Sequence, residues 1–219
     1  MLLEVSHLKK SYKNGRVRAV DGVSLRLEKN ETLGLVGASG SGKSTLAKLI
    51  LGVLPTDEGE ISFSARGGPA SGGHGASMGA IFQDPLLSLD PKMTVKDILE
   101  EPFRIQGRRD KHFLEQKVKE MLLAVELPEK FIFRHPHELS GGECQRVAIA
   151  RAIGTEPELI ICDEPVSSLD TLTRAQILNL LLKLQKQKGV SYLFISHDLR
   201  VVRHMSDRVL VMQDGKVLE

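Results

Sequence analysis

Residues 37–45 of this sequence carry the residue types that bind a triphosphate. They read Gly-Ala-Ser-Gly-Ser-Gly-Lys-Ser-Thr and fit the pattern G-x-x-x-x-G-K-[ST]. Glycines let successive backbone N–H groups converge on one anion, because a Cβ would block the close approach. We expect Lys43 to reach the β- and γ-phosphates and Ser44 to place its hydroxyl on Mg²⁺. This phosphate loop predicts nucleoside triphosphate binding, but alone it does not separate kinases, GTPases and transport ATPases.

A second stretch places two carboxylates at the end of an apolar strand. Residues 159–162 read Leu-Ile-Ile-Cys, and Asp163 and Glu164 follow. Ligand-binding residues gather at the carboxyl ends of parallel strands. Asp163 is suited to hold Mg²⁺, directly or through water, and Glu164 to polarise a water for attack on the γ-phosphate. An isolated Asp-Glu pair would more simply solvate a strand end, but the accompanying phosphate loop favours the catalytic interpretation.

These motifs require a scaffold of strands and helices, and the hydrophobic pattern supplies one. Alternating segments predict half-buried antiparallel strands before Glu31, whereas near-continuous apolar segments predict buried parallel strands. The alternating segments are 3–5, 17–20 and 23–28, and the apolar ones are 33–36, 159–162 and 192–195. Helices are predicted at 43–51, from 141 to about 153, at 172–188 and at 199–205. A terminal hairpin is predicted from 209–212 and 216–218, across Asp214-Gly215.

Two segments depart in composition and hydrophobic pattern from this alternation of strands and helices. Residues 94–127 carry apolar side chains at three- and four-residue spacing, which predicts a small helical subdomain inserted in the sheet. Residues 64–77 are dominated by Gly, Ser and Ala, from which no packed element can be built, so we expect a flexible surface loop there.

Composition places the chain among ordinary globular proteins. Hydrophobic residues make up 41% and charged residues 26% of the 219, and the formal net charge is +2, which gives no reason to expect a nucleic-acid partner. Cys144 and Cys162 lack metal-ligand spacing and are interpreted as reduced thiols of a cytosolic protein. The first five residues predict a strand and not a signal peptide. Apolar runs such as 46–54 are too short to span a bilayer, so other chains must do so if the protein serves a membrane.

Residues 139–143, Leu-Ser-Gly-Gly-Glu, are the most specific feature. With this signature, the sequence resembles the ATP-binding subunits of ABC transporters, and the match runs from Tyr12 to Glu219 with the motifs in the family's order. The family usually has Gln where Glu143 stands. The resemblance implies an α/β P-loop NTPase fold: a mostly parallel core sheet, an N-terminal antiparallel β-subdomain and an inserted α-helical subdomain. Residues 1–219 then form one nucleotide-binding domain, with the core in 1–84 and 157–219 and the helical subdomain at about 85–156.

The resemblance also implies an assembly. Ser140, Gly141 and Gly142 open a helix and so form a second anion-binding terminus, which one chain cannot easily fold onto its own phosphate loop. Two cassettes are expected to lie head to tail, with ATP between the phosphate loop of one and the signature of the other. The second subunit is expected to be a paralogue, as is typical of the peptide and nickel group.

Individual positions match the family's site residues. Tyr12 matches the aromatic residue that stacks on adenine, although an ordinary strand-edge tyrosine remains an alternative. Gln83 matches the glutamine that senses Mg²⁺ and the γ-phosphate, and His197 the histidine that contacts the γ-phosphate. The expected catalytic residues are Glu164, His197 and Gln83, and the expected Mg²⁺ residues are Ser44, Gln83 and Asp163. The expected nucleotide-binding residues are Tyr12, Gly37, Ser39, Gly40, Gly42, Lys43, Ser44, Thr45, Ser140, Gly141, Gly142 and Asp170, the last in a segment that crosses the dimer interface.

Residues 82–91 and 135–138 resemble the ATPases of peptide and nickel importers. The chain ends at Glu219, without the C-terminal extension common in peptide importers, and this favours the nickel type. The expected function is therefore ATP hydrolysis coupled to uptake of nickel or peptides. The protein is expected at the cytoplasmic face of the membrane, bound to permease subunits and served indirectly by an extracytoplasmic binding protein.

Two other functions compete with this interpretation. A soluble ABC-type ATPase acting on ribosomes or DNA would usually carry two cassettes or long coiled coils, which 219 residues do not provide. A nucleotide kinase or plain NTPase would leave the signature, Gln83 and His197 unexplained. Salt-sensitive binding to RNA or DNA would favour the first alternative, and a hydrolysis rate strictly linear in protein concentration the second.

Overall fold

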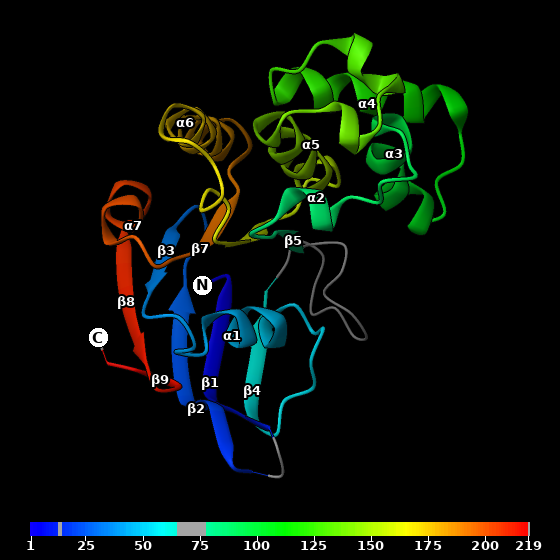
Figure 1. Cartoon of the computed structure of the whole chain (residues 1–219). Coiled ribbons are helices and arrows are strands. Elements are labelled where there is room, and N and C mark those ends of the chain that lie inside the picture. The colour runs from blue at the N-terminus through cyan, green and yellow to red at the C-terminus, as the bar shows by residue number, and fades with distance from the viewer. Residues whose placement is uncertain (13–14, 65–77, 219) are drawn as a thin grey trace. The chain divides into compact units, whose positions relative to one another are not determined.

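The computed structural model describes residues 1–12, 15–64 and 78–218, which form two compact units (Figure 1). The first unit comprises Met1–Ala80, Glu158–Glu164 and Gly189–Glu219, and the second Ile81–Pro157 and Pro165–Lys188. The expected boundaries of the core and helical subdomain stay a prediction. The predicted flexible loop, apart from Ser64, lies outside the described residues.

An antiparallel sheet opens the first unit. It contains β1 (Leu3–Tyr12), β2 (Val17–Leu27) and β4 (Glu58–Phe63) in the order β2-β1-β4. Leu3 pairs with Leu27 on one side and with Phe63 on the other, and all three side chains are buried. The alternating pattern before Glu31 thus predicted β1 and β2 correctly, but no pattern in the sequence indicated β4.

The core sheet carries the site. Its order is β5-β6-β7-β3-β8-β9, and its strands are β5 (Met78–Ile81), β6 (Leu159–Asp163), β7 (Ser191–Ser196), β3 (Thr32–Val36), β8 (Arg208–Gln213) and β9 (Lys216–Val217). The pairs β6–β7, β7–β3 and β3–β8 are parallel, and β8–β9 is the antiparallel terminal hairpin. Every residue of β3, β6 and β7 is buried, as continuous apolar runs predict for parallel strands. Two helices, α1 (Lys43–Ile50) and α7 (Leu199–Met205), belong to the same unit.

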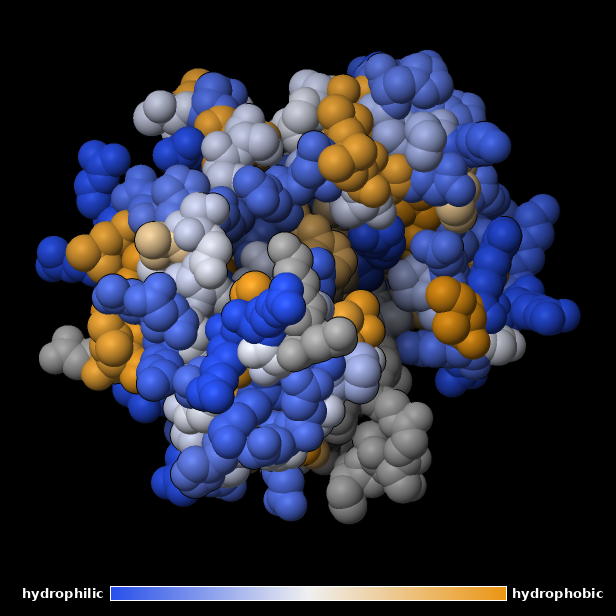
Figure 2. Space-filling view, turned by 60° about the horizontal axis from the view of Figure 1, so that its bottom comes forward, coloured by the Kyte–Doolittle hydropathy of each residue, from blue (hydrophilic) through white to orange (hydrophobic). Residues whose placement is uncertain are grey.

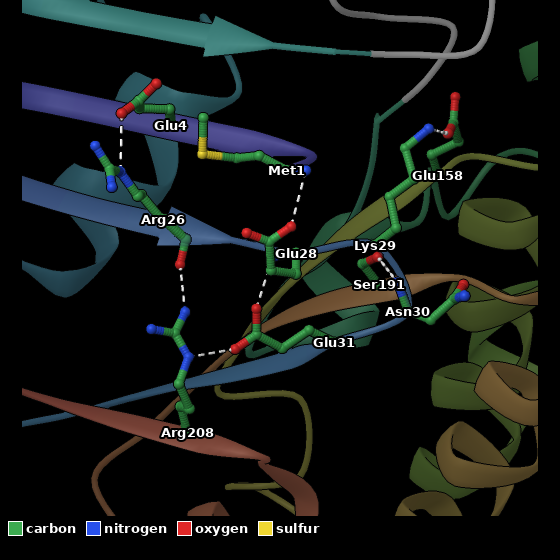
Figure 3. A network of polar contacts seen from close by, with 10 residues as sticks. All are labelled: Met1, Glu4, Arg26, Glu28, Lys29, Asn30, Glu31, Glu158, Ser191 and Arg208. Atoms are coloured by element: carbon green, nitrogen blue, oxygen red, sulfur yellow. Dashed lines mark hydrogen bonds and ion pairs between the residues drawn. The ribbon is translucent and has the colours of Figure 1, made fainter.

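A polar network ties the antiparallel sheet to the core sheet (Figure 3). The guanidinium of Arg208, at the start of β8, donates to Glu31 and to the carbonyl of Arg26, and Arg26 in turn donates to Glu4 on β1. Nearby, the backbone N–H of Asn30 donates to the hydroxyl of Ser191 at 2.8 Å. Because most of these charges are partly exposed, each pair contributes little stability, and the network mainly fixes how the sheets meet.

The second unit is helical. Its elements are α2 (Pro85–Ser88), α3 (Val95–Ile105), α4 (Lys111–Ala124), the 3₁₀ helices η2 (Glu129–Phe133) and η3 (Pro136–Glu138), α5 (Gly141–Gly154) and α6 (Thr171–Lys188). The predicted helical stretch 94–127 is two helices, because the backbone at Gly107 takes a φ of +82° between them. Thr94 and Asp110 cap α3 and α4 through their side chains. The predicted apolar face, including Ile98, Leu99 and Val118, is buried.

Within the described residues, no helix combines the length and apolar character needed to cross a bilayer. The face shown in Figure 2 is mostly hydrophilic, and its apolar residues occur in small separate groups. Scattered apolar residues of this kind are ordinary for a protein surface.

Candidate functional site

The phosphate loop joins the buried strand β3 to helix α1 and is held open by its glycines. Gly42, directly before the helix, has a φ of +107°, and a Cβ there would lie 2.0 Å from the carbonyl oxygen of Ala19. A Cβ on Gly37 would lie 2.2 Å from the carbonyl oxygen of Met212. Both positions therefore require glycine, while Ser39 and Gly40 lie exposed at the tip of the loop.

Lys43 lies buried beneath this loop. Its ammonium donates to the carbonyl oxygens of Gly37 and Ala38, at 2.8 Å each. Burial lowers the pKa of Lys43, and the carboxylates of Glu164 and Asp163 act in the opposite direction. The structure thus holds a desolvated cation inside the loop with oxygen partners that a phosphate group could replace.

The N-terminus of α1 also suits an anion. The first turn of α1 has neither a side-chain cap nor an acidic residue, whereas Thr94, Asp110 and Ser140 cap the helices α3, α4 and α5. The side chains of Ser44 and Thr45 in that turn are exposed and half-buried, respectively. Backbone N–H groups at an uncapped N-terminus, together with the helix dipole, favour phosphate oxygens.

Asp163, the last residue of β6, has the surroundings of a cation ligand. The residue is buried, with 9% of its surface exposed, and within the described residues its Oδ1 atom has no hydrogen-bond partner. Burial raises its pKa, the Glu164 charge adds to this, and a hydrogen bond from Ser44 and the Lys43 charge oppose it. An orphaned buried carboxylate oxygen beside a serine hydroxyl fits Mg²⁺, which prefers oxygen ligands and usually completes its shell with water and phosphate.

Glu164 and His197 meet at the carboxyl ends of two neighbouring strands. Glu164 Oε2 lies 3.0 Å from His197 Nδ1, and the backbone N–H of Glu164 donates to Ile195 O at 2.9 Å. Glu164 adopts a φ of +52°, in the left-handed region that an L-residue avoids at a cost of roughly 1–2 kcal/mol. The left-handed backbone at Glu164 thus interrupts the extended run of β6 directly after Asp163.

Tyr12 ends β1 in the same unit, paired with Val17, and 39% of its surface is exposed. The accessible ring is compatible with stacking on a flat ligand.

The other site residues belong to the second unit. Gln83 is exposed in the bend between β5 and α2. Ser140 caps α5, whose first residues are Gly141 and Gly142. Asp170 caps α6: its Oδ1 accepts from the N–H groups of Leu172 and Thr173, both at 3.0 Å. The expected residues therefore fall into two groups, one around the phosphate loop and one around the signature.

Sequence reasoning missed what supports the phosphate loop. Besides the carbonyls of Ala19 and Met212, the N–H of Gly215 donates to Ser41 O at 3.0 Å, and the N–H of Asp21 donates to Gly215 O at 2.8 Å. Asp214-Gly215 signalled a hairpin, but no local pattern reveals that this hairpin contacts a loop some 170 positions earlier in the chain.

Comparison with known families and proteins agrees with this geometry. A family described as "ABC transporter" matches residues 20–167. The oligopeptide transport ATP-binding protein OppF of Salmonella typhimurium is 46% identical, over 100% of this chain and 71% of that protein. OppF of Bacillus subtilis is 44% identical, over 100% of this chain and 74% of that protein.

Solved structures match over the whole chain as well. A dimeric post-hydrolysis state of the ATP-binding cassette MJ0796 bound to ADP and Pi has a TM-score of 0.86 and 30% identity, covering 100% of this chain and 97% of that one. CbiO1 from Clostridium perfringens, part of an ABC transporter complex, has a TM-score of 0.85 and 28% identity, covering 100% and 87%. The predicted fold, with its antiparallel sheet, core sheet and helices, is that of these cassettes.

Proposed function

Because this chain belongs to the ABC transporter family and is an ATPase, we propose that it drives an importer of oligopeptides. The relatives named above are oligopeptide transport proteins, which supports peptides as the cargo. Nickel, which the position of Glu219 was expected to favour, gains no support from them. These relatives extend beyond the matched region, so the position of the last residue carries no weight.

The observation that carries the chemistry is the cluster around the phosphate loop. Lys43, Ser44, Asp163, Glu164 and His197 come from α1, the end of β6 and the end of β7, and they lie within one compact unit. A buried cation, an orphaned carboxylate oxygen and a paired Glu–His serve together in phosphoryl transfer to water.

Each residue has a distinct role in this proposal. Lys43 and the backbone N–H groups of residues 40–45 bind the phosphates and stabilise charge that develops on the γ-phosphoryl group. Ser44, Asp163 and Gln83 would hold Mg²⁺, which neutralises phosphate charge when it is bound.

Glu164 and His197 act on the attacking water and the γ-phosphate. The Glu164 carboxylate orients the water and accepts its proton. His197, whose Nδ1 lies 3.0 Å from Glu164 Oε2, contacts the γ-phosphate and fixes the direction of that carboxylate. Tyr12 stacks on the adenine ring.

The signature residues Ser140, Gly141 and Gly142 bind the γ-phosphate of ATP held by a second cassette, and Asp170 lies at that interface. We take the second cassette to be a paralogue and the assembly to lie peripherally at the cytoplasmic face. ATP-driven closure passes through Gln83 and the helical unit to the permease, which receives peptides from an extracytoplasmic binding protein. The dimeric state of the MJ0796 cassette supports such a pairing.

The test is purification of the tagged chain from membranes with whatever permease accompanies it. We expect a complex whose ATP hydrolysis rises with a peptide-loaded binding protein. In this complex Glu164→Gln should abolish hydrolysis and trap ATP. Glu58→Gln, which alters an exposed carboxylate on β4, should leave the rate unchanged.

Two results would contradict the proposal. Wild-type hydrolysis in Glu164→Gln would remove Glu164 from the reaction. Stimulation by nickel-loaded but not by peptide-loaded binding protein would refute the cargo while leaving the ATPase intact.

A further inference from the structure

Gln145 is a fully buried polar side chain on α5 that the proposed chemistry does not use. Its exposure is 0%, and neither Nε2 nor Oε1 has a hydrogen-bond partner within the described residues. Native proteins pair almost all such groups, so each exception needs an explanation. A methionine of similar length would fill the same space without the cost of burying an unpaired amide.

The position of Gln145 links it to the signature. It follows Gly141 by four residues and Gly142 by three, so all three lie on one face of α5. This face contacts Leu169 and the start of α6. A Cβ on Gly142 would lie 2.6 Å from Thr173 Cγ2, which is too close, and one on Gly141 would lie 3.7 Å from Leu169 Cδ2, an ordinary contact. The signature turn therefore cannot move far without pushing on residues 169–173.

A second unpaired group lies at the start of α6. The guanidinium of Arg174 donates from one terminal nitrogen to Leu169 O at 3.2 Å, and its backbone N–H donates to Asp170 O at 2.8 Å. Its buried Nε atom, however, has no partner among the described residues. Unpaired polar atoms thus occur on α5 and on α6, and α6 directly follows residues 165–170, the segment that connects it to Glu164.

We propose that Gln145 is a positioning residue that couples the signature to Glu164 of its own chain. Its amide, which has no hydrogen-bond partner among the described residues, gains hydrogen bonds from the backbone of residues 165–170 when the signature engages ATP. Those bonds fix the segment that follows Glu164 directly, and so they set the carboxylate for the attacking water. This role rests on the proposed function, because it requires ATP bound at the signature.

The coupling has a thermodynamic consequence. A buried amide without partners destabilises the chain, whereas the hydrogen bonds that it gains on engagement stabilise the engaged state, so both effects favour closure. Replacing the amide with an apolar side chain removes both effects at once. The free chain should become more stable, and catalysis should become slower.

Gln145→Met tests this in the complex purified with its partners. We expect a higher Tm of the nucleotide-free chain, an unchanged ATP concentration at half-maximal rate, and a kcat about tenfold lower, equivalent to about 1.4 kcal/mol. Ser206→Ala is the matched control, because Ser206 Oγ is also buried without a partner in the described residues but lies in the first unit, after α7. It should raise the Tm and leave kcat unchanged.

Two outcomes would overturn the proposal. A lower Tm in Gln145→Met would show that the amide is already paired in the free chain. A wild-type kcat in a variant of raised Tm would show that the amide has no part in catalysis. Wild-type protein that hydrolyses no ATP would count instead against the proposed function itself.

Discussion

Glu143 places a negative charge where the signature is proposed to receive a phosphate. Its Oε2 accepts the N–H of Ser140 at 2.7 Å, and its own N–H donates to Ser140 Oγ at 3.3 Å, a reciprocal capping box. The backbone and hydroxyl hydrogen bonds of Ser140, together with the charge of Arg134, hold the pKa of Glu143 below its usual range. Glu143 is therefore ionised at neutral pH. We predict that Glu143→Gln strengthens ATP-dependent closure.

The size of the effect follows from Coulomb's law. At a separation of about 5 Å, two unit charges repel by about 0.8 kcal/mol in water and about 3 kcal/mol at an effective dielectric constant of 20. Because Glu143 is half-buried, we take a repulsion of about 1 kcal/mol between its carboxylate and each unit of phosphate charge. Closure should become roughly fivefold tighter per unit of charge. In the absence of ATP, Glu143→Gln should lower the free energy of unfolding by about 0.3–1 kcal/mol, because a carboxylate stabilises a helix N-terminus better than an amide does.

The assay is the ATP concentration that closes the dimer in a Glu164→Gln background, measured at low and high salt. The advantage of Glu143→Gln should shrink as salt rises, because the charge is partly exposed. Glu138→Gln is the control: Glu138 caps η3 in the same way, accepting the His135 N–H at 2.7 Å, but it precedes the signature helix. Equal ATP requirements for Glu143→Gln and its parent at low salt would refute the reasoning.

Two further predictions concern stability around the phosphate loop. Burial raises the pKa of Asp163, so its ionised form destabilises the protein without nucleotide at neutral pH. Asp163→Asn should therefore raise the free energy of unfolding by about 1 kcal/mol, which corresponds to a few degrees in Tm. Thermal scans should show the higher Tm of Asp163→Asn at pH 7–8. The difference in Tm should decline as the pH falls through the raised pKa of Asp163, because the wild-type carboxyl then becomes neutral. A difference that grows toward acid pH would contradict this reasoning. Gly42→Ala should lower the free energy of unfolding, measured in urea, by more than about 2 kcal/mol, because its Cβ would clash with Ala19 O. Gly40 also has a positive φ, +80°, but no atom lies within 4 Å of the Cβ that an alanine would add. Gly40→Ala should therefore lower the free energy of unfolding by only about 1 kcal/mol. Equal losses in the two variants would refute the steric argument.

The sequence predicted most of the core because its strands carry distinct patterns. Three segments are apolar throughout and lie in β3, β6 and β7, namely residues 33–36, 159–162 and 192–195. A continuous apolar pattern predicts a strand buried on both faces, and all three strands are buried in this way. The helix after the phosphate loop and the helix after the signature begin at Lys43 and Gly141, where the motifs place them.

Features that depend on distant backbone contacts were not predictable. Strand β4 was missed because Gly59 and two glutamates weaken its pattern; its pairing with β1 decides its structure. The left-handed backbone of Glu164 has no sequence signal, and it accompanies a hydrogen bond from the Glu164 N–H to Ile195 O on a neighbouring strand. The unpaired amide of Gln145 was equally invisible, because a glutamine in a helix pattern looks like a surface residue.

The hairpin of β8 and β9 makes the phosphate loop depend on residues far from it in the sequence. Every motif that contacts nucleotide in this proposal precedes residue 198, yet the carbonyl of Met212 and the N–H of Gly215 form one wall of the loop. During synthesis, the nucleotide site can take its final form only after this hairpin has left the ribosome. A fragment ending after α7 would hold all the motifs and still lack a finished cradle for the phosphates.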